Sequence, residues 1–226
     1  MRLTVPLKKY ELTLGFLYLA LELLLLPQVL GLLNLTLQLP PWGVNFLFFC
    51  VNFICVTVIF HRFLLDSFRI VIAYPWRLLR YSGQGLLICF VGNYLISLAI
   101  LIVQPDFSNI NDASIAQMAD ENRVLITLGT VVLVPVVEEC LYRGLIFRGL
   151  FDRSKVLAYT ISTVCFAVIH VLGYLGTAEP ITLILCFVQY LPAGIALAYA
   201  YHKSDTIWTP ILMHMAINQI GMSIGG

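Results

Sequence analysis

Apolar residues fill most of the chain in long runs, which short polar segments separate. A helix needs about 17–25 mostly apolar residues to cross the ~30 Å hydrocarbon core of a membrane. Seven runs are near this length: residues 12–33, 44–64, 85–103, 124–147, 156–175, 181–201 and 207–224. The pattern therefore predicts an all-α fold, a polytopic membrane bundle of about seven transmembrane helices.

Two segments need a separate interpretation. The chain starts with basic residues before its first apolar run, as a signal peptide does. That run is longer than the ~15 residues of a signal-peptide core and lacks a small-residue cleavage site, so we expect it to stay as the first span. Residues 68–82 are less apolar, and they could form an interfacial or re-entrant helix rather than a loop.

The basic residues indicate how the bundle is oriented, because cytoplasmic loops collect Lys and Arg. With the N-terminus inside, the cytoplasmic segments hold Arg2, Lys8, Lys9, Arg62, Arg69, Arg77, Arg80, Arg148, Arg153, Lys155 and Lys203. The opposite side keeps Arg123 alone, and its longest loop, residues 104–122, carries acidic residues and no basic ones. The asymmetry favours an N-in, C-out chain.

Composition excludes several classes of protein. The chain is 60% hydrophobic and 11% charged, with a mean hydropathy of +0.93, whereas a soluble domain is roughly half apolar and a quarter charged. The net charge of +1 provides no basic surface for a nucleic acid. No repeat or linker divides the chain, so we expect a single integral membrane domain over residues 1–226, surrounded by the lipid bilayer.

Three charged residues, Glu138, Glu139 and Arg143, interrupt the fourth apolar run. An ionisable group at membrane depth costs at least ~2.5 kcal/mol on insertion scales, and such a group is by default a functional candidate. Glu139 and Arg143 are four residues apart, the spacing of an ion pair on one helix face, and this pair could simply join two helices. Glu138 points about 100° away around the helix. It is therefore left free for chemistry.

Polar residues on two later spans could complete a site with Glu138. His170 lies near the end of the fifth span, and His214 and Asn218 share one face of the seventh. At a rise of 1.5 Å per residue, Glu138 lies ~15 Å from one end of its span and Asn218 ~16 Å from one end of its own. The corresponding distances are ~10 Å for His214 and ~21 Å for His170, and helix tilt can absorb these differences. A lone intramembrane histidine is commonly just a core hydrogen-bond donor. Together, however, these residues predict one site near mid-membrane.

This set of residues permits two kinds of hydrolytic chemistry. Glu138 with His170 could hold and deprotonate a water, while His214 and Asn218 donate hydrogen bonds to an oxyanion, without any metal or cofactor. Alternatively, Glu138, His170 and His214 could bind zinc with an open position. We rank zinc second because an HExxH motif is absent and the amide of Asn218 is a poor zinc ligand.

The motifs Glu138-Glu139-x-x-x-Arg143, Phe166-x-x-x-His170 and His214-x-x-x-Asn218 occur in this order on separate predicted helices. In this they resemble the CPBP (Abi) family, which groups CAAX prenyl endopeptidases with bacteriocin-processing and bacteriocin-immunity proteins. The resemblance covers about residues 130–218, and the segment from Gln189 to Gly194 resembles a third, looser family motif. It implies a metal-free glutamate protease in which Glu138 and His170 activate water, His214 and Asn218 bind the oxyanion, and Glu139 and Arg143 support the architecture.

The leading hypothesis is an intramembrane endopeptidase that acts on a membrane-associated peptide or protein, with its catalytic core in residues 124–224. A second hypothesis is a regulatory or bacteriocin self-immunity protein that binds a partner, such as a membrane sensor kinase, without hydrolysis. A proton-linked transporter is a third, because buried Glu and His also form proton relays. We expect a multi-pass protein of the bacterial plasma membrane.

Overall fold

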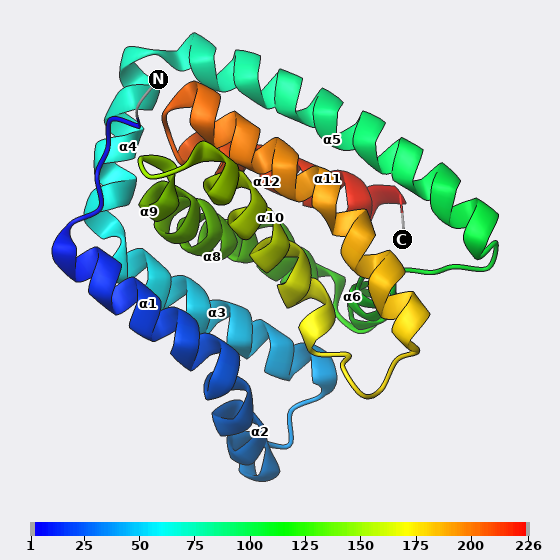
Figure 1. Cartoon of the computed structure of the whole chain (residues 1–226). Helices are drawn as coiled ribbons and strands as arrows, with labels where there is room; N and C mark the ends of the chain where they lie inside the picture. Colours follow the sequence, from blue (N-terminus) through cyan, green and yellow to red (C-terminus); the bar gives the residue numbers. More distant parts are fainter. Residues whose placement is uncertain (1–2, 225–226) are drawn as a thin grey trace.

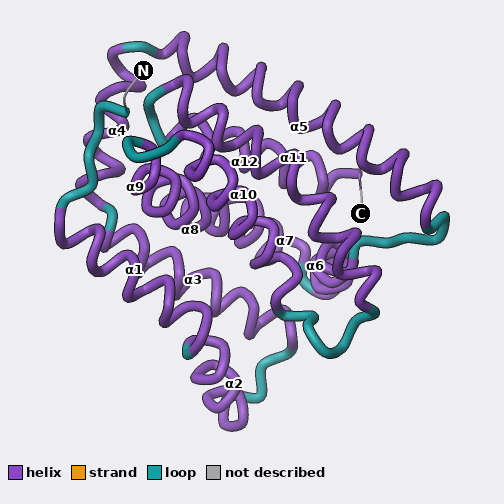
Figure 2. Tube along the Cα trace, viewed as in Figure 1, coloured by secondary structure: helices purple, strands orange, loops and turns teal. Residues whose placement is uncertain are grey.

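The computed structural model describes residues 3–224, and this part of the chain consists of helices joined by loops, without a strand (Figures 1 and 2). The elements are α1 (Lys9–Leu24), α2 (Leu26–Leu37), α3 (Pro41–Ile59), α4 (His61–Ala73), α5 (Pro75–Val103), α6 (Ile110–Glu121), α7 (Arg123–Leu128), η1 (Gly129–Leu133), α8 (Val134–Glu138), η2 (Glu139–Phe147), α9 (Arg148–Phe151), α10 (Lys155–Leu172), α11 (Pro180–Ser204) and α12 (Trp208–Ile224). The predicted all-α membrane bundle is confirmed.

Local sequence signals set several of these helix ends. Proline is the first residue of α3, α5 and α11, where its fixed φ suits a helix and its missing N–H costs no hydrogen bond. Asn109 caps α6 by accepting from the backbone N–H groups of Asn111 and Asp112. Ser154 caps α10 by accepting from the N–H of Leu157. Such caps satisfy backbone donors that have no partner within the helix.

The helices differ in whether they are long and apolar enough to cross a membrane. Among the described residues, five segments are long and apolar enough to cross a membrane: α3, α5, the continuous segment Arg123–Phe151, α10 and α11. The pair α1 and α2 passes the same test only together, and it is bent by 51°. α12, with 17 residues, is shorter than these spans. The count of seven and the N-in, C-out orientation therefore stay predictions.

Two predicted segments differ from the structure in detail. The expected first span, 12–33, is broken at Leu25, where the backbone leaves helical geometry before α2 begins with Pro27 in its first turn. The segment 68–82 is not a loop: it comprises the end of α4 and the start of α5, which are separated at Tyr74, the residue before Pro75. Proline disfavours the helical conformation in the residue that precedes it.

α11 is the centre of the bundle, where it packs against α5 and α10 (Figure 1). Small residues allow this close approach. A Cβ atom on Gly194 would lie 2.8 Å from Cγ2 of Thr163 on α10, and one on Gly92 of α5 would lie 2.8 Å from Cβ of Pro192. Pro192 thus sits inside α11 at a tight contact with α5. Pro192 and Gly194 of the looser motif are therefore packing positions.

Candidate active site

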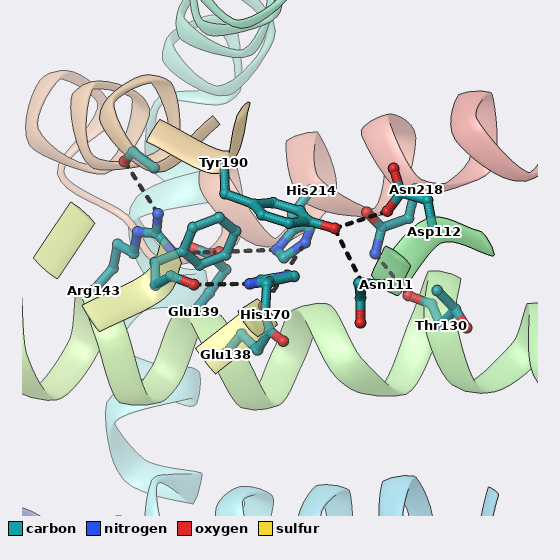
Figure 3. Close-up of polar contacts among 12 residues, drawn as sticks. Asn111, Asp112, Thr130, Glu138, Glu139, Arg143, His170, Tyr190, His214 and Asn218 are labelled. Carbon is teal, nitrogen blue, oxygen red and sulfur yellow. Dashed lines mark hydrogen bonds and ion pairs between the residues drawn. The ribbon is translucent and has the colours of Figure 1, made fainter. Parts of the chain in front are cut away.

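A cavity of about 630 Å³ lies inside the bundle, and its lining includes Glu138, His170, His214 and Asn218. These four residues come from α8, α10 and α12. Figure 3 shows Glu138, His170 and His214 gathered beneath Tyr190, with Asn218 further along α12. The structure therefore brings all four predicted residues to one cavity, as their estimated depths suggested. Their roles in catalysis stay predictions.

The helix that carries the two glutamates is irregular. Two π-helical segments, η1 and η2, flank the short α8 with its Pro135, and Glu138 and Glu139 lie at the junction of α8 and η2. Pro135 has no N–H to continue the α-helical ladder, and π-helical turns are found frequently at functional sites. All nine residues of η2 are buried. The wide turns thus occur where this helix is surrounded by protein.

The predicted ion pair between Glu139 and Arg143 is present and fully buried. Nη1 of Arg143 lies 3.0 Å from Oε1 of Glu139, and both side chains are 0% exposed. Nη2 of Arg143 donates to the carbonyl oxygen of Gly194 at 3.1 Å, and the guanidinium lies 4.4 Å from the ring centroid of Phe166. Arg143 therefore joins the glutamate helix to α10 and α11.

His214 lies between the two glutamates, a position that helical phase did not reveal. Its Nδ1 lies 2.9 Å from Oε1 of Glu139, the oxygen that also accepts from Arg143. Its Nε2 lies 4.0 Å from Oε2 of Glu138, an oxygen without a hydrogen-bond partner in the described part of the chain. Glu139 thus does more than neutralise Arg143, because it also orients His214.

His170 is held by its own helix and by an aromatic neighbour. Its Nδ1 lies 2.7 Å from the carbonyl oxygen of Phe166, and its ring stacks on Tyr190 with centroids 4.0 Å apart and an interplanar angle of 28°. Within residues 3–224, no hydrogen bond or ion pair joins His170 to Glu138. The two residues line the same cavity, but the structure describes no polar contact between them.

Asn218 contacts the start of the irregular helix that carries the two glutamates. Its Nδ2 donates to the carbonyl oxygen of Thr130, in η1, at 2.8 Å. Because an amide NH₂ group has two N–H donors, one donor is used by this bond and the other is left. Asn218 therefore anchors α12 to η1, in addition to any role beside His214.

Several polar residues of the cavity were not singled out from the sequence. Tyr190 donates to Asp112 at 2.7 Å and accepts from Asn111 at 3.1 Å, so it links His170 to α6 (Figure 3). Glu22 of α1 also lines the cavity. A usable signal existed for Glu22, since it is a lone carboxylate within the first apolar run. Tyr190 lies in the looser motif from Gln189 to Gly194, but no local pattern marked its contacts, because its partners lie about 80 residues away.

No group of three His, Cys, Asp or Glu side chains is arranged to hold a metal ion within residues 3–224. Glu138 and His214 approach one another, but His170 turns its Nδ1 to the backbone of its own helix. The zinc alternative through Glu138, His170 and His214 is thus without a preformed ligand set.

Comparisons with known proteins agree with the motifs. Residues 120–220 match the family model described as "Type II CAAX prenyl endopeptidase Rce1-like". The chain is 34% identical over 94 residues to the UPF0177 protein YbdJ of Lactococcus lactis, which is 42% of this chain and 36% of the relative. It is 31% identical over 85 residues to the "Putative membrane peptidase YdiL" of Bacillus subtilis, which is 37% of this chain and 30% of the relative.

The chain spans about a third of the length of these curated relatives, and no solved structure gives a significant match. Both relatives are bacterial, in accord with the expected multi-pass protein of a bacterial plasma membrane. The family match begins just before α7 and ends within α12, so it includes the glutamates, both histidines and Asn218. Over residues 120–220 the chain is therefore similar to the Rce1-like endopeptidase family.

Proposed function

We propose that this chain is an intramembrane endopeptidase, CAAX-protease-like in type, which hydrolyses a peptide bond of a membrane-associated peptide or protein. The observation that carries the proposal is the position of Glu138. This partly buried carboxylate has an oxygen without a hydrogen-bond partner among the described residues, faces His214 across 4.0 Å, and lines a cavity of about 630 Å³. The match to the endopeptidase family model supports the same reaction class.

In the proposed reaction, Glu138 acts as the general base on a water molecule bound in the cavity. The water oxygen attacks the carbonyl carbon of the substrate while its proton passes to Glu138. The C–N bond then breaks, and the departing amine takes a proton from Glu138. The free oxygen of Glu138 suits this role, because a carboxylate that was already committed to an ion pair would be a weaker base.

His170 is proposed to hold the same water. A backbone carbonyl can only accept, so the contact with Phe166 requires that Nδ1 of His170 carries the proton. In the neutral ring, Nε2 is then an acceptor. Stacking on Tyr190 fixes the plane of the ring. His170 can therefore accept a hydrogen bond from water without forming a direct contact with Glu138.

His214 and Asn218 are proposed to stabilise the oxyanion. His214 donates from Nδ1 to Glu139, so a hydrogen bond from its Nε2 to the oxyanion requires a proton on both nitrogens. The second N–H of Asn218 is the other donor, since the first is bonded to Thr130. Donors that are fixed in advance in a site shielded from water are the most effective form of such stabilisation.

Comparative peptidomics of membranes that contain either the wild-type chain or the Glu138→Ala variant would test the proposal. We expect peptides that disappear with Glu138→Ala and with His170→Ala, while both variants insert into the membrane in normal amounts. Unchanged peptide profiles would refute hydrolysis. A cellular phenotype that survives Glu138→Gln would instead favour the regulatory hypothesis, in which the chain binds a partner such as a sensor kinase.

A further inference from the structure

Two glutamates are buried on α1, and they differ in their surroundings. Glu11 is 0% exposed, and its two oxygens accept hydrogen bonds from the backbone N–H groups of Lys8 and Phe63 at 2.7 and 2.9 Å. Glu22 is 8% exposed, and its Oε2 is buried with no hydrogen-bond partner among the described residues. Glu11 has a structural role at the start of the bundle. That explanation does not extend to Glu22.

The polar neighbours of Glu22 are occupied with other partners. Tyr18, one turn earlier on α1, donates to Oδ1 of Asn52 at 2.7 Å. The amide of Asn52 donates to the carbonyl oxygen of Phe48 at 2.9 Å. These bonds occupy the hydroxyl of Tyr18 and one N–H of Asn52, and none of the hydrogen bonds among the described residues reaches Oε2 of Glu22. An unpaired buried carboxylate is costly, so a partner from outside the chain would stabilise it.

Glu22 and Glu138 line the same cavity, and the cavity is acidic. Its lining includes Glu22, Asp112, Asp120 and Glu138, whereas Arg123 is the only Lys or Arg that lines it among residues 3–224. Asp112 accepts a hydrogen bond from Tyr190, whereas Glu22 accepts none that the structure describes. An occupant with a positive charge and several N–H donors would satisfy this lining better than an uncharged one.

We propose that Glu22 is a specificity-determining residue that binds a basic side chain, lysine or arginine, of the peptide that enters this cavity. The proposal rests on the proposed function, because it assigns a substrate class to the same cavity. Glu22 lies outside residues 120–220, which match the family model. The selection of substrate would thus come partly from α1, which precedes the region that carries the proposed chemistry.

Binding can be measured separately from cleavage. The probes are two fluorescent eleven-residue peptides, five leucines on each side of either lysine or norleucine, which keeps the alkyl chain and lacks the ammonium group. The full chain is used in lipid nanodiscs with Glu138→Gln, so that hydrolysis cannot consume the probe. We expect the lysine peptide to bind at least about tenfold more tightly than the norleucine peptide, as a buried charge pair would provide.

Adding Glu22→Gln should reduce that ratio to below about twofold by weakening the lysine peptide alone. Glu179→Gln is the matched control, because it makes the same change at an exposed acid before α11, and it should leave the ratio intact. A ratio that is unchanged by Glu22→Gln would overturn the proposal. Equal weakening of both peptides would also overturn it, since Glu22 would then contact the peptide backbone.

The comparison of the two probes on the chain with Glu22 intact does not depend on whether Glu22→Gln folds. Equal binding of lysine and norleucine peptides there would by itself refute the proposal. Hydrolysis is scored in a separate assay with Glu138 intact. If neither peptide is cleaved while the lysine preference depends on Glu22, the proposed hydrolysis of these peptides fails and the binding role of Glu22 stands.

Discussion

Nδ1 of His214 lies 2.9 Å from Oε1 of Glu139, and that same oxygen accepts a hydrogen bond from Arg143 at 3.0 Å. One carboxylate oxygen therefore connects α12 to the helix of the glutamates. Arg143 extends the connection to α11 through the carbonyl oxygen of Gly194. The ion pair that looked purely architectural thus also fixes the orientation of a proposed catalytic histidine.

Glu139→Gln should impair both stability and activity. The variant removes a charge that faces Arg143 and His214 in a fully buried setting, and loss of one partner from such a pair typically costs 3–5 kcal/mol. We expect a clear fall in the thermal midpoint in nanodiscs. The comparison is Glu138→Gln, which removes no hydrogen bond that the structure describes and should unfold close to the wild type. Equal midpoints for the two variants would contradict this assignment.

Tyr190 should act mainly through its ring. Tyr190→Phe keeps the ring stacked on His170 and loses the bonds to Asp112 and Asn111, so we expect kcat to change by less than about threefold. Tyr190→Leu removes the stacking and should lower kcat at least about tenfold with a smaller effect on KM, as misplacement of a catalytic group does. Equal kcat values for both variants would show that His170 is positioned without Tyr190.

Gly194→Ala should destabilise the bundle. The added methyl group would lie 2.8 Å from Cγ2 of Thr163, and overpacking of this kind costs about 1–3 kcal/mol. Relief of this clash would also displace the backbone at position 194, and with it the carbonyl oxygen that accepts from Arg143. Gly149→Ala is the control, because no atom of another helix lies within 4 Å of the position that its methyl group would take. Thermal unfolding would show whether only the first variant is affected, and a similar midpoint for both would contradict the packing argument.

Chelation should leave the activity unchanged if Glu138 activates water without a metal. The measurement is hydrolysis of a cleaved peptide before and after treatment with EDTA and dialysis. Loss of activity that added zinc restores would instead establish the alternative in which Glu138, His170 and His214 bind the metal. The Glu138→Gln variant is inactive under both mechanisms, so it cannot replace this experiment.

Local spacing was enough to predict the contact between Glu139 and Arg143, because residues four apart share one helix face. The bond between His214 and Glu139 crosses 75 positions of sequence, and it depends on how α12 packs, which no local pattern records. The same holds for Asn218 with Thr130 and for Tyr190 with Asp112. Sequence therefore predicted that Glu138, His170, His214 and Asn218 meet in one cavity, but not which atoms pair across the helices.

The predicted first span shows a second feature that hydropathy did not predict. Residues 12–33 are apolar throughout most of their length, so hydropathy alone favoured one straight helix. The structure bends the segment by 51° between α1 and α2. Pro27, which lies two residues after the break, was visible in the sequence. Its effect on the helix direction was not predicted, since proline is also tolerated inside membrane helices.

The wide turns of η2 have a consequence for the length of the chain. Deleting one residue between Glu139 and Phe147 would allow a regular α-helix, which is the commoner form. It would also remove one of nine buried side chains from the packing around Glu139 and Arg143, and the neighbouring side chains would have to move to fill the gap. A shorter chain could therefore form a more regular helix and yet lose its site. Along these nine residues, spacing is as strict a requirement as the identity of the residues themselves.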